Sequence, residues 1–109
     1  MQMILEVDQL QKAVELLQER LSPEAIYLFG SQATGKALQE TSDVDLCIIV
    51  GDDKEPYRET VNAYESLQDM LFPKDIIVRR KSRFEERAAW PSTLEHEVRQ
   101  TGRMIYPHA

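Results

Sequence analysis

The chain has 109 residues, and 19 acidic against 13 basic side chains give it a formal net charge of −6. A chain of this length buries one modest core, so we expect residues 1–109 to form a single domain. The acidic balance disfavours proteins that rely on attraction to phosphate backbones, so we expect no direct nucleic-acid binding.

The first third of the chain predicts a helix, a strand and a phosphate-binding turn. Apolar residues recur at helical spacing and end near Ser22: Met3, Val7, Leu10, Val14, Leu17 and Leu21. Residues 25–29 form an apolar run typical of a strand, and Gly30 and Ser31 follow where it ends. A glycine there lets the backbone approach a phosphate, and the serine hydroxyl can donate to its oxygens. Lys36 adds a positive charge nearby.

Two aspartates open the next predicted strand. Asp43 and Asp45 flank the start of an apolar, β-branched run that stops at Gly51. Residues two apart on a strand share one face, so these carboxylates should stand side by side. Ionised neighbours repel each other, and a divalent cation between them relieves that repulsion. Ligation by oxygen alone favours Mg²⁺ or Mn²⁺ over zinc, so the pair predicts such a metal site.

A helix and a third strand follow. Pro56 can open a helix, and apolar residues give the segment a stripe: Tyr57, Val61, Tyr64, Leu67 and Leu71. Asp75 then opens the apolar run of residues 75–78. If this strand lies beside the strand of Asp43 and Asp45, three carboxylates converge, which is enough ligation for two metal ions.

The last third combines a basic stretch with short helical segments. The basic stretch consists of Arg79, Arg80, Lys81, Arg83 and Arg87. It could reach a nucleotide triphosphate or an acidic partner, but we favour a solvated loop and helix face. Trp90 precedes Pro91, which breaks the helix, and is either a plug on the core or an anchor for a partner. Another helical segment is expected at about residues 92–101.

The single cysteine points to a reducing environment. Cys47 lies inside a predicted buried strand and, as the only cysteine, can form no internal disulfide. A catalytic role beside Asp45 is conceivable, but a packed core thiol is the better interpretation. The amino terminus lacks the features of a signal peptide, and no segment is long enough to span a membrane. We expect a cytoplasmic protein.

The order of elements predicts the fold class. Strands interleave with helices over a short chain, which favours an α/β (α+β) fold with a small mixed sheet. We expect the helices to pack mainly on one face and to leave the metal edge open to solvent.

This arrangement resembles the minimal nucleotidyltransferases of the DNA polymerase β superfamily, the small class often paired with a HEPN-domain toxin. The family pattern is Gly, Ser, a spacer of about ten residues, Asp, x, Asp, and a later Asp on a neighbouring strand. The matching residues here are Gly30, Ser31, Asp43, Asp45 and Asp75. A short helix, Gly102 and the strand of residues 104–106 also resemble the family's usual ending.

The resemblance implies a polymerase β-like fold and Mg²⁺-dependent nucleotidyl transfer from ATP, with two ions. Asp43 and Asp45 would hold both ions, and Asp75 would ligate the ion at the acceptor hydroxyl and accept its proton. Gly30 and Ser31 would fix the β and γ phosphates so that pyrophosphate leaves in line with the attack.

The resemblance further implies an antitoxin that transfers AMP from ATP to a tyrosine of a HEPN ribonuclease toxin and silences it. A domain this small has no room for a second unit that holds the acceptor, so a macromolecular acceptor is expected. Two alternatives remain open. One is a non-catalytic antitoxin or scaffold that masks its partner by contact, and the other is a transferase for a small hydroxylated molecule.

Overall fold

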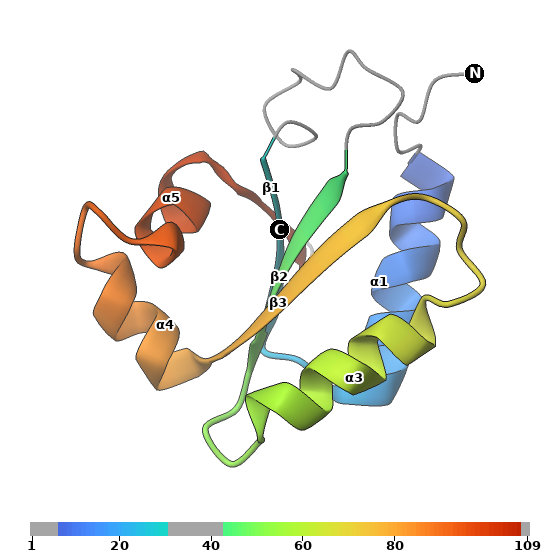
Figure 1. The fold of residues 1–109 in the computed structure, drawn as a ribbon, viewed down its shortest axis with the longest axis horizontal. Coiled ribbons are helices and arrows are strands. Elements are labelled where there is room, and N and C mark those ends of the chain that lie inside the picture. Colours follow the sequence, from blue (N-terminus) through green and yellow to red (C-terminus); the bar gives the residue numbers. More distant parts are fainter. Residues whose placement is uncertain (1–6, 31–42, 108–109) are drawn as a thin grey trace.

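Four strands and four helices make up the part of the chain that the computed structural model describes, residues 7–30 and 43–107. The strands are β1 (Ala25–Phe29), β2 (Val44–Val50), β3 (Lys74–Arg80) and β4 (Arg103–Tyr106). The helices are α1 (Val7–Leu21), α3 (Pro56–Ser66), α4 (Lys81–Ala88) and α5 (Leu94–Thr101). Figure 1 shows these helices on both sides of a central sheet.

The sheet is mixed, as predicted. Its strand order is β3-β2-β1-β4. Strand β1 runs antiparallel to both of its neighbours, β2 and β4, whereas β2 and β3 run parallel. The end of β1 therefore lies at the same edge of the sheet as the beginnings of β2 and β3.

Residues of β2 alternate between two cores, one on each face of the sheet. Leu46 and Ile48 join the core that contains Leu17 of α1 and Ala63 of α3. Cys47 and Ile49 join a second core, whose helix residues are Phe84 and Ala88 of α4 and Val98 of α5. Burial on both faces explains why β2 reads as a continuous apolar run.

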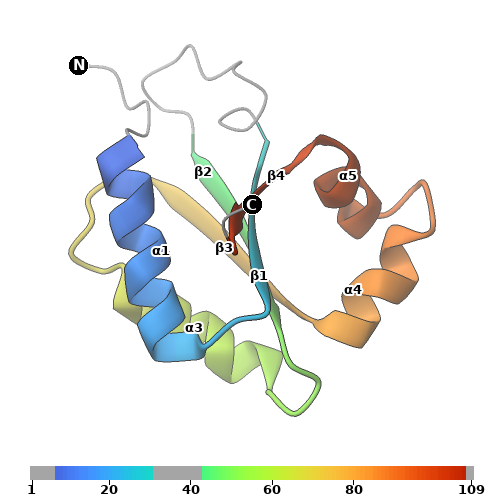
Figure 2. The same cartoon turned by 180° about the vertical axis from the view of Figure 1, so that it is seen from behind.

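The distribution of the helices corrects one expectation. The fold class is as predicted, but the helices do not pack mainly on one face: α1 and α3 lie on one side of the sheet and α4 and α5 on the other (Figures 1 and 2). Short helical segments were expected in this part of the chain, but their position on the opposite face was not, because each helix has only 8 residues and buries few apolar side chains. Phe84 anchors this pair by stacking on Tyr27 of β1, with ring centroids 5.6 Å apart.

Local capping sets where the helices begin and end. Helix α1 ends at Leu21, and Ser22 then takes a φ of 47°, which stops the helix as its sequence predicts. Helix α3 starts at Pro56, preceded by Glu55, whose carboxylate accepts a hydrogen bond of 2.8 Å from the Arg58 amide. It ends at Ser66, so the apolar stripe does not continue helically to Leu71, which is 90% exposed.

No helix within the described residues is long and apolar enough to cross a bilayer.

Candidate active site

The strand of Asp75 pairs with the strand of Asp43 and Asp45, which is the condition under which we expected the three carboxylates to converge. In the parallel ladder of β2 and β3, Asp45 lies directly opposite Asp75. Neighbouring strands are about 4.8 Å apart, and residues in register on them point to the same face. Asp43 precedes Asp45 by two residues and is exposed, as is Asp75, whereas Asp45 is half-buried.

Gly30 borders this pair from the third strand. Phe29, the last residue of β1, is in register with Asp45 across the antiparallel ladder, so Gly30 follows at the same edge of the sheet. Its φ is +74°, a conformation that side chains with a Cβ rarely adopt. A Cβ at Gly30 would also overlap Oδ2 of Asp45. Only glycine fits here, because the backbone of Gly30 lies against the Asp45 carboxylate. The approach of a phosphate to Gly30 stays a prediction.

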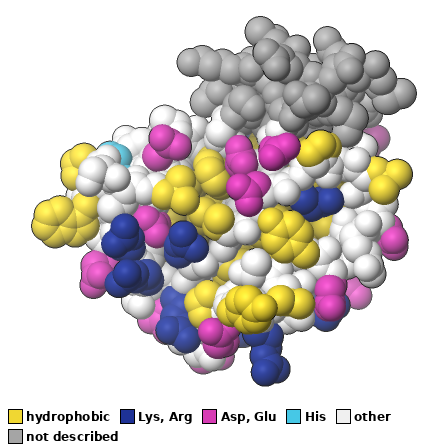
Figure 3. All heavy atoms as spheres, viewed as in Figure 1, with side chains coloured by type: hydrophobic (Ala, Val, Ile, Leu, Met, Phe, Trp, Pro, Cys, Tyr) yellow, Lys and Arg dark blue, Asp and Glu magenta, His cyan; other side chains and the backbone are white. Residues whose placement is uncertain are grey.

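The electrostatic environment of Asp45 favours binding of a cation. Burial raises the pKa of Asp45 above its usual 3.8, and the charges of Asp75 and Asp43 raise it further. Within residues 7–30 and 43–107, no Lys or Arg forms an ion pair with Asp45. Acidic side chains gather at this edge of the molecule in Figure 3, beside the grey segment. A divalent cation would relieve the repulsion among them.

The donor set fits a hard cation, because it offers carboxylate oxygens and no sulfur or imidazole. Within the described part of the chain, however, no three His, Cys, Asp or Glu side chains are arranged closely enough to enclose a metal ion. Metal ligation by Asp43, Asp45 and Asp75 therefore stays a prediction. The predicted phosphate-binding residues Ser31 and Lys36 lie outside the described residues.

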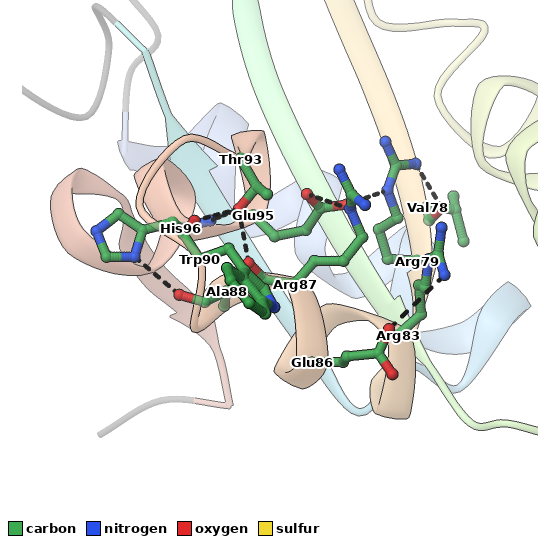
Figure 4. Close-up of polar contacts among 10 residues, drawn as sticks. All are labelled: Val78, Arg79, Arg83, Glu86, Arg87, Ala88, Trp90, Thr93, Glu95 and His96. Atoms are coloured by element: carbon green, nitrogen blue, oxygen red, sulfur yellow. Dashed lines mark hydrogen bonds and ion pairs between the residues drawn. The ribbon is translucent and has the colours of Figure 1, made fainter.

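A second buried carboxylate, Glu95 of α5, was not identified from the sequence. Its side chain is 4% exposed, and its two oxygens accept hydrogen bonds from Arg79 Nε at 2.9 Å and Arg87 Nε at 3.2 Å. Figure 4 shows both arginine side chains pointing toward Glu95. Burial alone would raise the pKa of Glu95, but the hydrogen bonds from the arginines outweigh it and hold the pKa below 4.5.

This contact changes the interpretation of the basic stretch. We favoured a solvated face for all five basic residues, yet Arg79 and Arg87 are held by Glu95, and Arg80 Nε donates to the Lys54 carbonyl at 2.8 Å. The signal that could have revealed this is the position of Glu95, three residues before the buried Val98 on the same helix face.

Cys47 is a packed core thiol, as we favoured. It is fully buried in the second core, and burial raises the pKa of its thiol from 9.0 to about 12, although Arg79 acts in the opposite direction. A thiol with this pKa carries almost no thiolate at neutral pH. Trp90 is 65% exposed, which excludes its role as a plug on the core.

Comparison with known proteins agrees with this geometry. The profile of the family described as "Polymerase beta, Nucleotidyltransferase" matches residues 11–108. A crystal structure of a protein from Sulfolobus solfataricus, provisionally described as a nucleotidyltransferase, superposes with a TM-score of 0.58 at 20% identity. The match covers 90% of this chain and 79% of that protein. A search of curated proteins found no match. Because the family profile spans nearly all of the chain, this chain belongs to the polymerase β nucleotidyltransferase family.

Proposed function

We propose that this nucleotidyltransferase is an antitoxin that transfers AMP from ATP to a tyrosine hydroxyl of a HEPN ribonuclease toxin and thereby neutralises it. The observation that carries the proposal is the register of Asp45 and Asp75, with Gly30 against the Asp45 carboxylate. Family membership supports nucleotidyl transfer in general. The nucleotide, the acceptor and the partner belong to the proposal.

The chemistry assigns a role to each carboxylate. Asp43, Asp45 and Asp75 would hold Mg²⁺, which, when bound, neutralises phosphate charge and lowers the pKa of the acceptor hydroxyl. The acceptor oxygen attacks the α-phosphorus of ATP, the bond to the bridging oxygen breaks, and pyrophosphate leaves. Asp75 accepts the proton of the hydroxyl, because it is the exposed carboxylate of the three that lies on the outermost strand.

The position of Asp75 also favours a large acceptor. Strand β3 is at the edge of the sheet, and Asp75 is exposed at its beginning. A tyrosine on the surface of a folded protein can approach such an edge without entering a deep cleft. A small hydroxylated molecule, by contrast, is usually held in an enclosed pocket.

The test is intact-mass spectrometry of the protein encoded by the neighbouring gene, after incubation with this chain, ATP and Mg²⁺. We expect a gain of one or more AMP units that is absent with the Asp43→Ala, Asp45→Ala double variant. A second double variant, Glu24→Ala, Asp53→Ala, removes two exposed carboxylates at the opposite end of the sheet, before β1 and after β2, and should leave the transfer intact.

The other outcomes separate the alternatives. A stable complex without any mass gain would overturn adenylylation and favour neutralisation by contact. Transfer of AMP from ATP to a small hydroxylated compound, without the partner protein, would favour the small-molecule transferase.

A further inference from the structure

An open pocket of about 570 Å³ lies beside the end of β3 and the beginning of α4, away from the aspartates. Its walls carry three arginines, Arg79, Arg80 and Arg83, with Glu86 as the acidic residue of the lining. The chain as a whole has a net charge of −6, so this concentration of arginines differs in sign from the rest of the molecule. A local reversal of charge of this kind marks a surface suited to an anionic ligand.

Two of these arginines are held in place through Nε. Arg79 Nε donates to Glu95 at 2.9 Å, and Arg80 Nε donates to the Lys54 carbonyl at 2.8 Å. Arg79 Nη1 also donates to the Val78 carbonyl at 3.0 Å. Within the described residues, the terminal nitrogens of Arg80 form no hydrogen bond or ion pair, although the charge of Asp52 interacts with that of Arg80. A guanidinium that is already fixed loses less conformational entropy when its remaining N–H groups bind a ligand.

The surroundings of the pocket leave it positive. Arg83 Nη1 lies 3.8 Å from Glu86 Oε1, and both side chains are largely exposed, so this pair neutralises little of the charge. Asp52 accepts a hydrogen bond of 3.0 Å from the Ser82 amide at the beginning of α4. Glu95 is shared between two arginines, so it compensates only one of them. Positive side chains therefore outnumber negative ones around the pocket.

The pocket and the aspartates lie along one strand. Arg79 follows Asp75 by four residues of β3, which corresponds to about 13 Å at the rise of an extended strand. In Figure 3 the acidic side chains at the upper edge and a group of Lys and Arg side chains below them face the same side. About four extended residues would connect an anionic group in the pocket to a hydroxyl at Asp75.

We propose that this arginine-lined pocket docks an acidic segment of the acceptor protein, so that carboxylates held by Arg79, Arg80 and Arg83 position the acceptor hydroxyl at Asp75. The inference rests on the proposed function for the identity of the acceptor. Carboxylates suit the site because guanidinium groups bind them through paired N–H donors. The net charge of −6 opposes a long polyanion such as a nucleic acid, whereas a short acidic segment meets only the positive pocket.

The first test needs no acceptor. A hexaglutamate peptide blocked at both ends serves as the probe, and NMR chemical shifts of the amides of residues 79–86 report its binding. We expect shifts at these amides, binding about tenfold weaker in the Arg80→Glu, Arg83→Glu variant, and weaker binding in added salt. The Lys12→Glu, Arg103→Glu variant changes the net charge equally on exposed residues outside the pocket lining and should bind like the wild type.

Other results of this experiment would overturn the inference. These are the absence of shifts at residues 79–86, or equal weakening in both charge variants. Inorganic phosphate is the second probe, and shifts with phosphate but not with the peptide would identify an inorganic anion site instead. Thermal unfolding checks each variant. Arg83→Glu alone, on an exposed part of α4, keeps the test valid if the loss of the Arg80 bond to Lys54 unfolds the double variant.

The second test uses AMP transfer to the acceptor protein and separates this inference from the proposed function. We expect the Arg80→Glu, Arg83→Glu variant to raise KM for the acceptor about tenfold and to leave kcat unchanged, because the reacting groups are untouched. An unchanged KM would overturn the docking role while the proposed function stands. Absence of transfer by the wild type would overturn the proposed function, and the peptide experiment would still decide the nature of the pocket.

Discussion

Two carboxylates on the same side of the sheet, Asp45 and Glu95, have opposite electrostatic surroundings. Asp45 is half-buried beside two other aspartates, and its pKa is raised by burial and then by their charges. Glu95 is more deeply buried, yet its pKa is lowered because Arg79 and Arg87 donate to it. Burial opposes ionisation in both cases, so the neighbouring charges decide the direction.

The contrast separates a carboxylate that supports the fold from one that is available for chemistry. Glu95 has both oxygens satisfied by its own chain, so an added cation would have to displace an arginine. The repulsion at Asp45 can be relieved by a bound cation, and its cost to folding is the kind of local strain found at functional sites. Changes at Glu95 and at Asp45 should therefore alter the free energy of unfolding in different ways, and the change at Glu95 should have the largest effect.

The largest effect is expected for Glu95→Ala. The change leaves Arg79 and Arg87 without their buried partner, and removal of one member of a buried ion pair costs about 3 kcal/mol, less where the partners reach solvent. Urea unfolding measures the loss, with Glu97→Ala, an exposed residue of the same helix, as the control. A loss no larger than that of the control would show that the arginines gain as much from water as from Glu95.

The pH dependence of this effect has a defined sign. The pKa of Glu95 is lower in the folded state than its usual 4.5, so the unfolded state takes up a proton first as the pH falls. The stabilisation by Glu95 is therefore fully present above about pH 4.5 and is lost as the pH falls through the folded-state pKa. In Glu95→Gln this part of the acid destabilisation should be absent.

Gly30→Ala is expected to have the next largest effect. The φ of +74° disfavours alanine, and the added Cβ would displace the Asp45 carboxylate, which together cost about 2 kcal/mol of stability. Because the displaced carboxylate is a predicted metal ligand, we also expect a large loss of nucleotidyl transfer. Gly51→Ala is the control, since its Cβ would meet only the side chain of Asp53. If Gly30→Ala transferred nucleotides at the wild-type rate, the turn at Gly30 would have no role in the reaction.

The site could be predicted as far as local patterns reach. The apolar runs located β2 and β3, and the spacing placed Asp43 and Asp45 on one face. Asp75 lies beside Asp45 only because β3 pairs with β2. From the sequence alone, this pairing could be stated only as a condition, and the observed register confirms it. Gly30 was identified for its backbone, but its contact with Asp45 required the antiparallel pairing of β1 and β2.

What the sequence did not reveal depends on contacts between distant segments. Glu95 reads as a polar helix residue until Arg79, 16 residues earlier, is placed beside it. The second helical layer was missed for a related reason, because α4 and α5 are short and contribute few apolar residues to the core, Phe84 among them. Pairings of this kind carry little local sequence signal.

Mg²⁺ should stabilise the wild-type chain, because a bound cation relieves the repulsion between Asp45 and its neighbouring aspartates. A cation that binds only the folded state adds about 1.4 kcal/mol to the free energy of unfolding at ten times its Kd. Thermal unfolding at increasing Mg²⁺ measures this, with Na⁺ at equal ionic strength as the control. The increase should disappear in Asp45→Asn and persist in Asp53→Asn, an exposed residue that follows β2 at the opposite end of the sheet. Equal stabilisation of both variants would show that the cation acts on overall charge.

The smallest effect, and the one opposite in sign, is expected for Asp45→Asn in metal-free buffer. The amide keeps the shape of the carboxylate and removes a repelled charge, so stability at neutral pH should rise by about 1 kcal/mol or less.

In the wild type the folded state binds a proton at Asp45 more tightly than the unfolded state, in which the pKa of Asp45 is near 3.8. Stability therefore falls as the pH rises from 3.8 through the raised folded-state pKa. The gain of Asp45→Asn should consequently be full at neutral pH and vanish below about pH 3.8 in urea titrations. If Asp45→Asn were instead less stable than the wild type at neutral pH, Asp45 would support the fold as Glu95 does, and the distinction between the two carboxylates would fail.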